Sequence, residues 1–117
     1  MSKVRTMTVR GVYLRFFMHA NARHDGKLLY EWILEQARKH KLGGGSVFRA
    51  VAGFGRHGVL HEEHFLELAG DLPLKLEFLL RESEADTLLD IVGKSGAELV
   101  YARSASEIGV IGAEQPD

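Results

Sequence analysis

The stretch "LKLEFLLRESEADTLLDIV", residues 74–92, decides the fold, because it contains both of the periods from which the fold is built. In residues 74–81 apolar side chains alternate mainly with charged ones, which is the period of a β-strand with one buried face. From residue 83 onward the apolar side chains take up helical spacing. The stretch therefore predicts a strand that leads directly into an amphipathic helix.

The predicted helix has a start signal and a buried face. Ser83, followed three residues later by Asp86, matches a capping box, in which polar side chains satisfy free backbone N–H groups of the first turn. Leu88, Leu89 and Val92 fall on one side of the helix. We expect this side to pack against the sheet.

The "GKSG" sequence at residues 93–96 has two interpretations. It fits the turn that ends the helix, since glycine commonly follows a helix. It also resembles the end of a phosphate-binding loop, but that motif requires a glycine five residues before Gly93, where Leu88 stands. We therefore expect a turn, from which Lys94 can still reach a ligand.

The same two periods recur on either side of this stretch. The further elements are a strand Val9–Met18, a helix between Asp25 as N-cap and Gly43 as stop, a strand Ser46–Gly53 and a strand Glu98–Arg103. The order βαββαβ is that of an α+β, ferredoxin-like fold, an antiparallel sheet with two helices on one face. We expect residues 1–117 to form one domain, with a short disordered tail at about 113–117.

Composition excludes several functional classes. The chain has 117 residues, a net charge of −1 and no cysteine, so neither nucleic-acid binding driven by overall charge nor a disulfide or thiolate site is expected. No segment approaches the roughly 20 apolar residues that span a bilayer. We expect a cytoplasmic protein without membrane insertion. No catalytic nucleophile or convincing carboxylate pair is found, so we do not expect an enzyme.

The strands carry apolar residues on both sides, although two helices can cover only one face of the sheet. The residues expected on the second face include Tyr13, Phe17, Val47, Val51 and Leu79. Because an uncovered apolar face favours association, we expect an oligomer.

The stretch "AGFGRHG", residues 52–58, follows a predicted strand and opens a connection of about 20 residues, 54–73. Connections of this length are usually functional or disordered. Gly53, Gly55 and Gly58 would let backbone N–H groups converge on an oxyanion, to which Arg56 adds a forked donor. The same glycines also fit a bulge at a strand end, and composition alone does not decide between these readings.

Three histidines follow in the pattern H-x-x-x-H-x-x-H. If the segment is helical, His57, His61 and His64 lie on roughly one face, which would suit zinc or copper. Surface histidines also cluster by chance. A metal site is therefore one of two interpretations.

Three quoted segments together resemble the nitrogen-regulatory PII signalling proteins, and most of all their compact PII-like relatives of unknown function. "RAVAGFGRHGVLHEEHF" at 49–65 resembles the base of the family's T-loop, and "DLPLKLEFLL" at 71–80 resembles the strand after that loop. "YARSASEIGV" at 101–110 resembles the C-terminal R-T-G-E-x-G signature. The resemblance extends from about residue 9 to residue 112.

The resemblance implies a trimer that binds an adenine nucleotide (ATP, ADP or AMP) in clefts between subunits. By position it assigns nucleotide contacts to Gly53, Phe54, Gly55, Arg56, His57, Lys94 and Arg103. His57 stands where many family members have a glutamine that helps to place magnesium. The family further implies a protein partner such as a transporter or channel, contacted through the 54–73 loop. The alternative is a zinc- or copper-binding trimer of the same fold.

Overall fold

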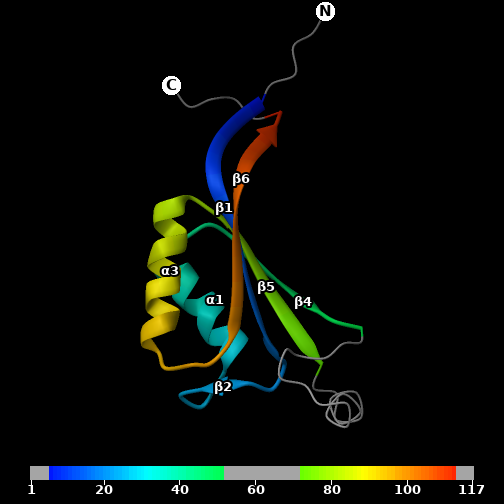
Figure 1. The fold of residues 1–117 in the computed structure, drawn as a ribbon, viewed down its shortest axis with the longest axis vertical. Helices are drawn as coiled ribbons and strands as arrows, with labels where there is room; N and C mark the ends of the chain where they lie inside the picture. Colours follow the sequence, from blue (N-terminus) through cyan, green and yellow to red (C-terminus); the bar gives the residue numbers. More distant parts are fainter. Residues whose placement is uncertain (1–5, 52–71, 113–117) are drawn as a thin grey trace, which may run out of the picture.

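The structure is a computed structural model that describes residues 6–51 and 72–112 (Figure 1). The predicted tail at 113–117 lies outside these residues. The strands and helices, in chain order, are β1 Thr6–His19, β2 Arg23–His24, β3 Lys27–Leu28, α1 Leu29–Lys39, β4 Gly45–Arg49, β5 Pro73–Leu80, α3 Glu82–Lys94 and β6 Val100–Ile111.

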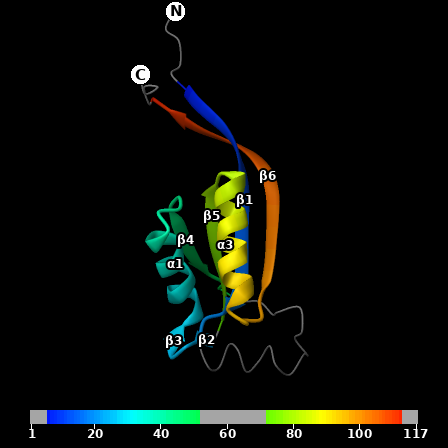
Figure 2. The same cartoon turned by 90° about the vertical axis from the view of Figure 1, so that its left-hand side faces the viewer.

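The main sheet has four strands in the order β4-β5-β1-β6, and every neighbouring pair is antiparallel. Counted along the four main strands, this is the fourth strand beside the first, then the third and the second. The predicted α+β, ferredoxin-like βαββαβ fold is therefore confirmed. Helices α1 and α3 lie side by side on one face of this sheet (Figures 1 and 2).

The core lies between this face and the two helices. Alternate residues of β1 and β5 point into it, and Phe16 meets Phe78 edge to face with ring centroids 6.1 Å apart. The largest fully buried side chains are Leu14, Phe16, Ile33, Leu76, Phe78, Leu80 and Leu88. The period of two that runs through residues 74–80 thus fixes which side of β5 is buried.

The predicted start of the first helix is wrong. Asp25 does not cap it: Leu28 is the N-cap, and no side chain bonds to the free N–H groups there. Asp25 and Gly26 instead have φ angles of 49° and 78° and form the two-residue turn between β2 and β3. An Asp-Gly pair suits such a turn because both central residues need positive φ.

The predicted start of the second helix is also displaced. The N-cap is Arg81 rather than Ser83, and the Arg81 N–H donates to Glu84 Oε1 at 2.8 Å. Glu84, rather than Asp86, therefore satisfies a free backbone donor of the first turn. The carboxylate of Asp86 instead accepts from a side chain of β6.

The last strand is much longer than the predicted Glu98–Arg103. It begins at Val100, and its pairing with β1 continues to Thr6↔Ile111. β5 pairs with β1 only from Val12 onward, so residues 6–11 and 106–111 form a two-stranded ribbon beyond the sheet. We call this ribbon the arm; Figure 2 shows it projecting past both helices.

The face of the sheet away from the helices is uncovered in the described chain, and we call it the open face. Phe17, Phe48 and Leu79 are 39%, 47% and 54% exposed on it. Val47 does not belong to it, contrary to the prediction, because it lies directly opposite the buried Leu76 and is therefore on the helix side. The open face consists of Tyr13, Arg15, Phe17, Ser46, Phe48, Lys75, Glu77, Leu79, Val100, Ala102 and Ser104.

Candidate functional site

Most of the predicted site lies outside the described residues. This holds for the predicted phosphate cradle, Gly53, Phe54, Gly55 and Arg56, and for the three histidines, His57, His61 and His64. Their nucleotide and metal assignments therefore remain predictions. Of the predicted contacts, the structure places Lys94 and Arg103.

The two ends of the connection that carries the cradle are held on the sheet. The Ala50 N–H donates to the Pro73 carbonyl at 2.9 Å, which continues the pairing of β4 with β5 by one step. The Ala20 N–H donates to the Leu72 carbonyl at 3.0 Å. The connection thus leaves and rejoins the sheet at neighbouring points.

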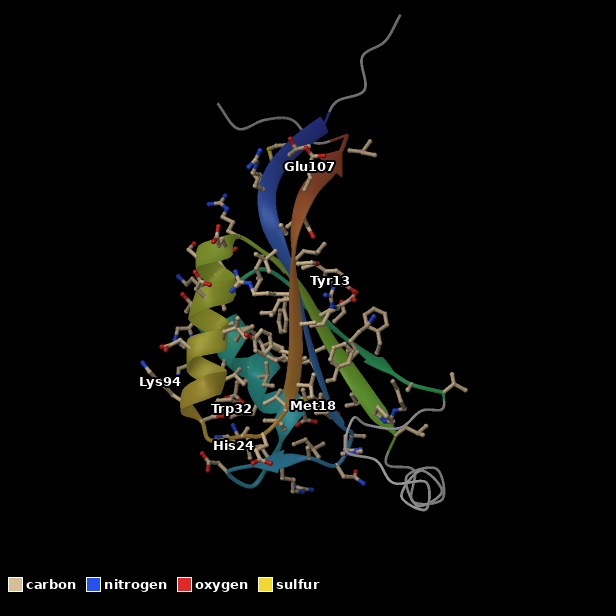
Figure 3. All side chains as sticks on the ribbon, viewed as in Figure 1. Tyr13, Met18, His24, Trp32, Lys94 and Glu107 are labelled. Atoms are coloured by element: carbon tan, nitrogen blue, oxygen red, sulfur yellow. The ribbon has the colours of Figure 1, made fainter. Side chains whose placement is uncertain are left out.

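Lys94 is the last residue of α3, and its side chain extends away from the sheet (Figure 3). Its Nζ lies 2.9 Å from Asp90 Oδ2, one turn earlier, and the side chain is 77% exposed. Ser95 follows as the C-cap, and Gly96 has a φ of 82°. The "GKSG" sequence is therefore a helix-ending turn, as predicted.

Arg103 lies on β6 opposite Leu14, on the side of the sheet that faces the helices. Its Nη1 donates to Asp86 Oδ1 of α3 at 2.8 Å. Asp86 and Lys94 are eight residues apart on one helix, or about 12 Å along its axis. The two predicted contacts are therefore not brought together within one copy of the chain.

Arg103 lines a groove of about 580 Å³ where the sheet continues into the arm. Its lining includes three small residues, Gly11, Ala105 and Ser106. The charged lining consists of Arg10, Glu82, Arg103 and Glu107. Such a volume accommodates a small molecule, and the lining offers guanidinium groups for phosphate and carboxylates for hydroxyl groups.

Sequence reasoning missed Arg10 and Glu107 as candidate site residues. The sequence did contain a signal for Arg10. It stands two residues before the buried Val12 on the same strand, so both side chains lie on the helix side of β1. Glu107 faces Arg10 across the two strands only because β6 continues past Arg103. Without that extension, no groove is predictable.

A second polar cluster lies at the centre of the open face. The Tyr13 hydroxyl donates to Glu77 Oε2, and Lys75 Nζ lies 3.3 Å from the same oxygen. Arg15 stacks on the Tyr13 ring at 4.2 Å, and Lys75 lies 4.9 Å from the centre of the Phe48 ring. These charges are thus engaged by groups of their own chain.

The contacts of this cluster favour its charged state. The hydrogen bond from Tyr13, followed by the contact with Lys75, lowers the pKa of Glu77 from its ordinary 4.5. The hydrogen bond to Glu77 raises the pKa of Lys75 from 10.5. Both groups are therefore ionised at neutral pH, and Glu77 stays ionised into mildly acidic solution.

Two kinds of site are not found in residues 6–51 and 72–112. No three His, Cys, Asp or Glu side chains there are grouped as metal ligands would be. His24, labelled near Trp32 in Figure 3, lies 3.2 Å from Asp25, and its ring is 4.4 Å from the Trp32 ring between centroids, tilted by 59°. Within the same residues, no helix has the length and apolar content that a membrane span requires.

Sequence comparison identifies a family and a relative. The model of the family DUF190, described as "Uncharacterized ACR", matches residues 11–103. A UPF0166 protein of Aquifex aeolicus is 32% identical over 87 residues, which are 74% of this chain and 83% of that protein.

Solved structures of PII-like proteins have the same fold. CPII of Thiomonas intermedia, bound to ADP and bicarbonate, aligns with a TM-score of 0.58 at 13% identity over 89% of this chain and 91% of that one. A putative PII-like signaling protein of Thermus thermophilus aligns with a TM-score of 0.55 at 15% identity, over 89% and 92%. The predicted resemblance to PII-like proteins and their compact relatives of unknown function is confirmed.

Proposed function

The chain belongs to the DUF190 family, and from this premise we propose that it is a non-enzymatic, PII-like regulatory protein that binds an adenine nucleotide between copies of itself. Binding would alter the 54–73 loop and its contact with a protein partner such as a transporter or channel. A ligand shifts such a loop only if it binds one arrangement better than the other. The structurally similar CPII was solved with ADP, and in another structure with ADP and AMP.

The observation that carries this proposal is the distance in the sheet between Arg103 and the end of β4, the strand that precedes Arg56 in the sequence. Arg103 is on β6 at one edge, and β4, which leads toward Arg56, is at the other edge. Three steps between strands separate the edges by about 14 Å. Arg103 pairs with Leu14 of β1, whereas the end of β4 is in register with Met18 of β1. The two points are therefore also displaced by roughly 13 Å along the strand direction.

The end of β4 is therefore roughly 19 Å from Arg103 within one copy, a separation that favours a site shared between copies. Two copies with adjacent edges can supply Arg56 and Arg103 to the same nucleotide. This is the arrangement that the family resemblance implies, a homotrimer with three equivalent clefts. In it, the groove beside Arg103 would receive part of the ligand, and the 53–57 segment of the neighbouring copy would receive the phosphates.

Titration calorimetry with ATP, ADP and AMP tests the proposal, and mixing of variants tests the shared site. Arg56→Ala and Arg103→Ala should each weaken binding in a homogeneous assembly. Mixed in equal amounts and reassembled, the two variants should restore parent-like affinity at about a quarter of the clefts, those with both arginines intact. Absence of nucleotide binding by the parent would refute the function. Binding without restoration would refute only the shared site.

A further inference from the structure

The arm consists of two strands without support from a third. Its six pairs run from Thr6↔Ile111 to Gly11↔Ser106, and no other described strand pairs with them. A two-stranded ribbon is marginally stable in water unless it packs on something else. We therefore expect the arm to be stabilised by packing against another surface.

The two sides of the arm differ in chemistry. Because side chains alternate along each strand, the side that continues the open face carries Met7, Val9, Ile108 and Val110. The opposite side carries Thr8, Arg10, Glu107 and Gly109, with Ile111 at the tip as its apolar exception. Val9 and Val110 are 40% and 47% exposed. An amphipathic ribbon outside the core indicates that its apolar side is covered by something other than this copy.

Gly11 keeps this apolar side flat where the arm joins the sheet. A Cβ atom at this position would lie 2.4 Å from Ile108 Cδ1 and 2.5 Å from the Leu80 carbonyl oxygen. The Ile108 side chain therefore occupies the space above Gly11. The apolar side chains of the arm and of the open face thereby lie on one continuous surface, over about 34 Å from Met7 to Phe17, with Tyr13 and Arg15 between them. We call these apolar side chains the strip.

The strip offers anchor side chains for an interface. Its five most exposed apolar side chains are Val9, Phe17, Phe48, Leu79 and Val110. With roughly half of each exposed, they offer about 350 Å² of apolar surface. A standard interface hides about 800 Å² per partner, somewhat more than half of it apolar. In a contact between the arm of one copy and the open face of another, these side chains are divided between the two partners, so they supply only part of that area and their half-buried neighbours supply the rest.

The charges on the open face favour a second copy of this chain as the occupant. Glu77 is already bonded to Tyr13 and Lys75, and Arg15 is stacked on Tyr13. The face therefore needs no opposite charge from a partner. Every copy also has both components, an arm with one apolar side and an open face whose exposed Phe17, Phe48 and Leu79 can cover that side.

We propose that the apolar side of the arm packs on the open face of a neighbouring copy of the same chain, and that Val9 and Val110 anchor it there. The contact joins two different surfaces, so repetition around a ring closes an assembly in which every arm and every open face is used. The inference rests on the self-assembly in the proposed function and adds the element that holds the copies together.

Two substitutions by aspartate, at adjacent residues on opposite sides of the arm, test the proposal by light scattering at about 10 μM protein. The parent should have a mass near three times 13.0 kDa. Val9→Asp should raise the dissociation constant of the assembly at least 100-fold, whereas Thr8→Asp, one residue away on the polar side, should leave it unchanged. A Val9→Asp variant whose dissociation constant, measured by dilution, equals that of the parent would refute the arm contact alone. A monomeric parent would refute the self-assembly as well.

Cross-linking keeps the proposal testable if Val9→Asp fails to fold. The chain has no cysteine, so single thiols can be placed freely. Val9→Cys mixed with Leu79→Cys should give a heterodimer with a short thiol cross-linker, and Thr8→Cys mixed with Leu79→Cys should not. Equal yields from both mixtures, or no product from the first in an assembled protein, would overturn the arm contact.

Discussion

If Arg103 binds a phosphate as proposed, the ligand competes with Asp86 for its guanidinium group, and this competition makes the role of Arg103 measurable. Its pair with Asp86 is close, 2.8 Å, but the two side chains are 29% and 63% exposed. Exposed ion pairs contribute about 0.2–1 kcal/mol. A charge-assisted hydrogen bond to a ligand contributes about 1.5–3 kcal/mol. The net gain on binding is the difference, about 0.5–2.8 kcal/mol.

Two substitutions should therefore change nucleotide affinity in opposite directions. Arg103→Ala should weaken binding roughly 2- to 100-fold, and Asp86→Ala, which frees the guanidinium, should strengthen it roughly 1.4- to 5-fold. Neither should change the free energy of unfolding by more than about 1 kcal/mol, because the pair is exposed.

Titration calorimetry with ADP measures the affinities, and denaturant unfolding provides the stability control. If Asp86→Ala and Arg103→Ala both weaken binding, then Asp86 positions Arg103 for the ligand and does not compete with the ligand. If Arg103→Ala binds ADP as the parent does, Arg103 is not a phosphate contact and the reasoning fails.

Three further predictions concern stability, pH and metal. Gly11→Ala should lower stability by about 1–3 kcal/mol, seen as a fall of roughly 4–12 °C in Tm, because its Cβ meets a backbone oxygen that cannot move aside; an unchanged Tm would contradict this. The pKa of Glu77 is lowered in the folded state, so ionised Glu77 stabilises the fold fully above about pH 4.5, and this stabilisation is lost as the pH falls through the pKa of the folded state. Glu77→Gln should therefore reduce the loss of unfolding free energy in acid. An unchanged dependence of the unfolding free energy on acidic pH would contradict the stabilising role of Glu77. Zinc titration of metal-free protein decides the metal hypothesis: His61→Ala combined with His64→Ala should abolish binding if the hypothesis is correct, and no binding by the parent would reject it.

The interior of the fold could be predicted from sequence because its signal is local. The alternation in residues 74–80 places Leu76 and Phe78 inside, and the structure has both fully buried. Helix starts were less predictable, since several polar residues near each end compete for the free N–H groups. At α3, Glu84 bonds to Arg81, and at α1, Asp25 serves the turn between β2 and β3 instead.

The candidate site depends on contacts that no short stretch encodes. Residues 104–107, Ser-Ala-Ser-Glu, have weak strand propensity of their own, and they form β6 because β1 lies beside them. The groove needs both that pairing and the beginning of α3. Arg103 was identified through family resemblance, whereas its bond to Asp86 joins residues 17 apart and required the structure.

The anchored ends of the 51–72 connection have an evolutionary consequence. Ala50 and Pro73 are bonded to one another on adjacent strands, so the distance that the connection must close is fixed by the sheet and not by its own sequence. The entropy of closing a flexible chain grows only with the logarithm of its length, about 0.6 kcal/mol for each doubling. A change in the length of this connection should therefore cost the rest of the domain little closure entropy. Descendants of one ancestral scaffold can therefore acquire different recognition sequences at this edge while they inherit the same core.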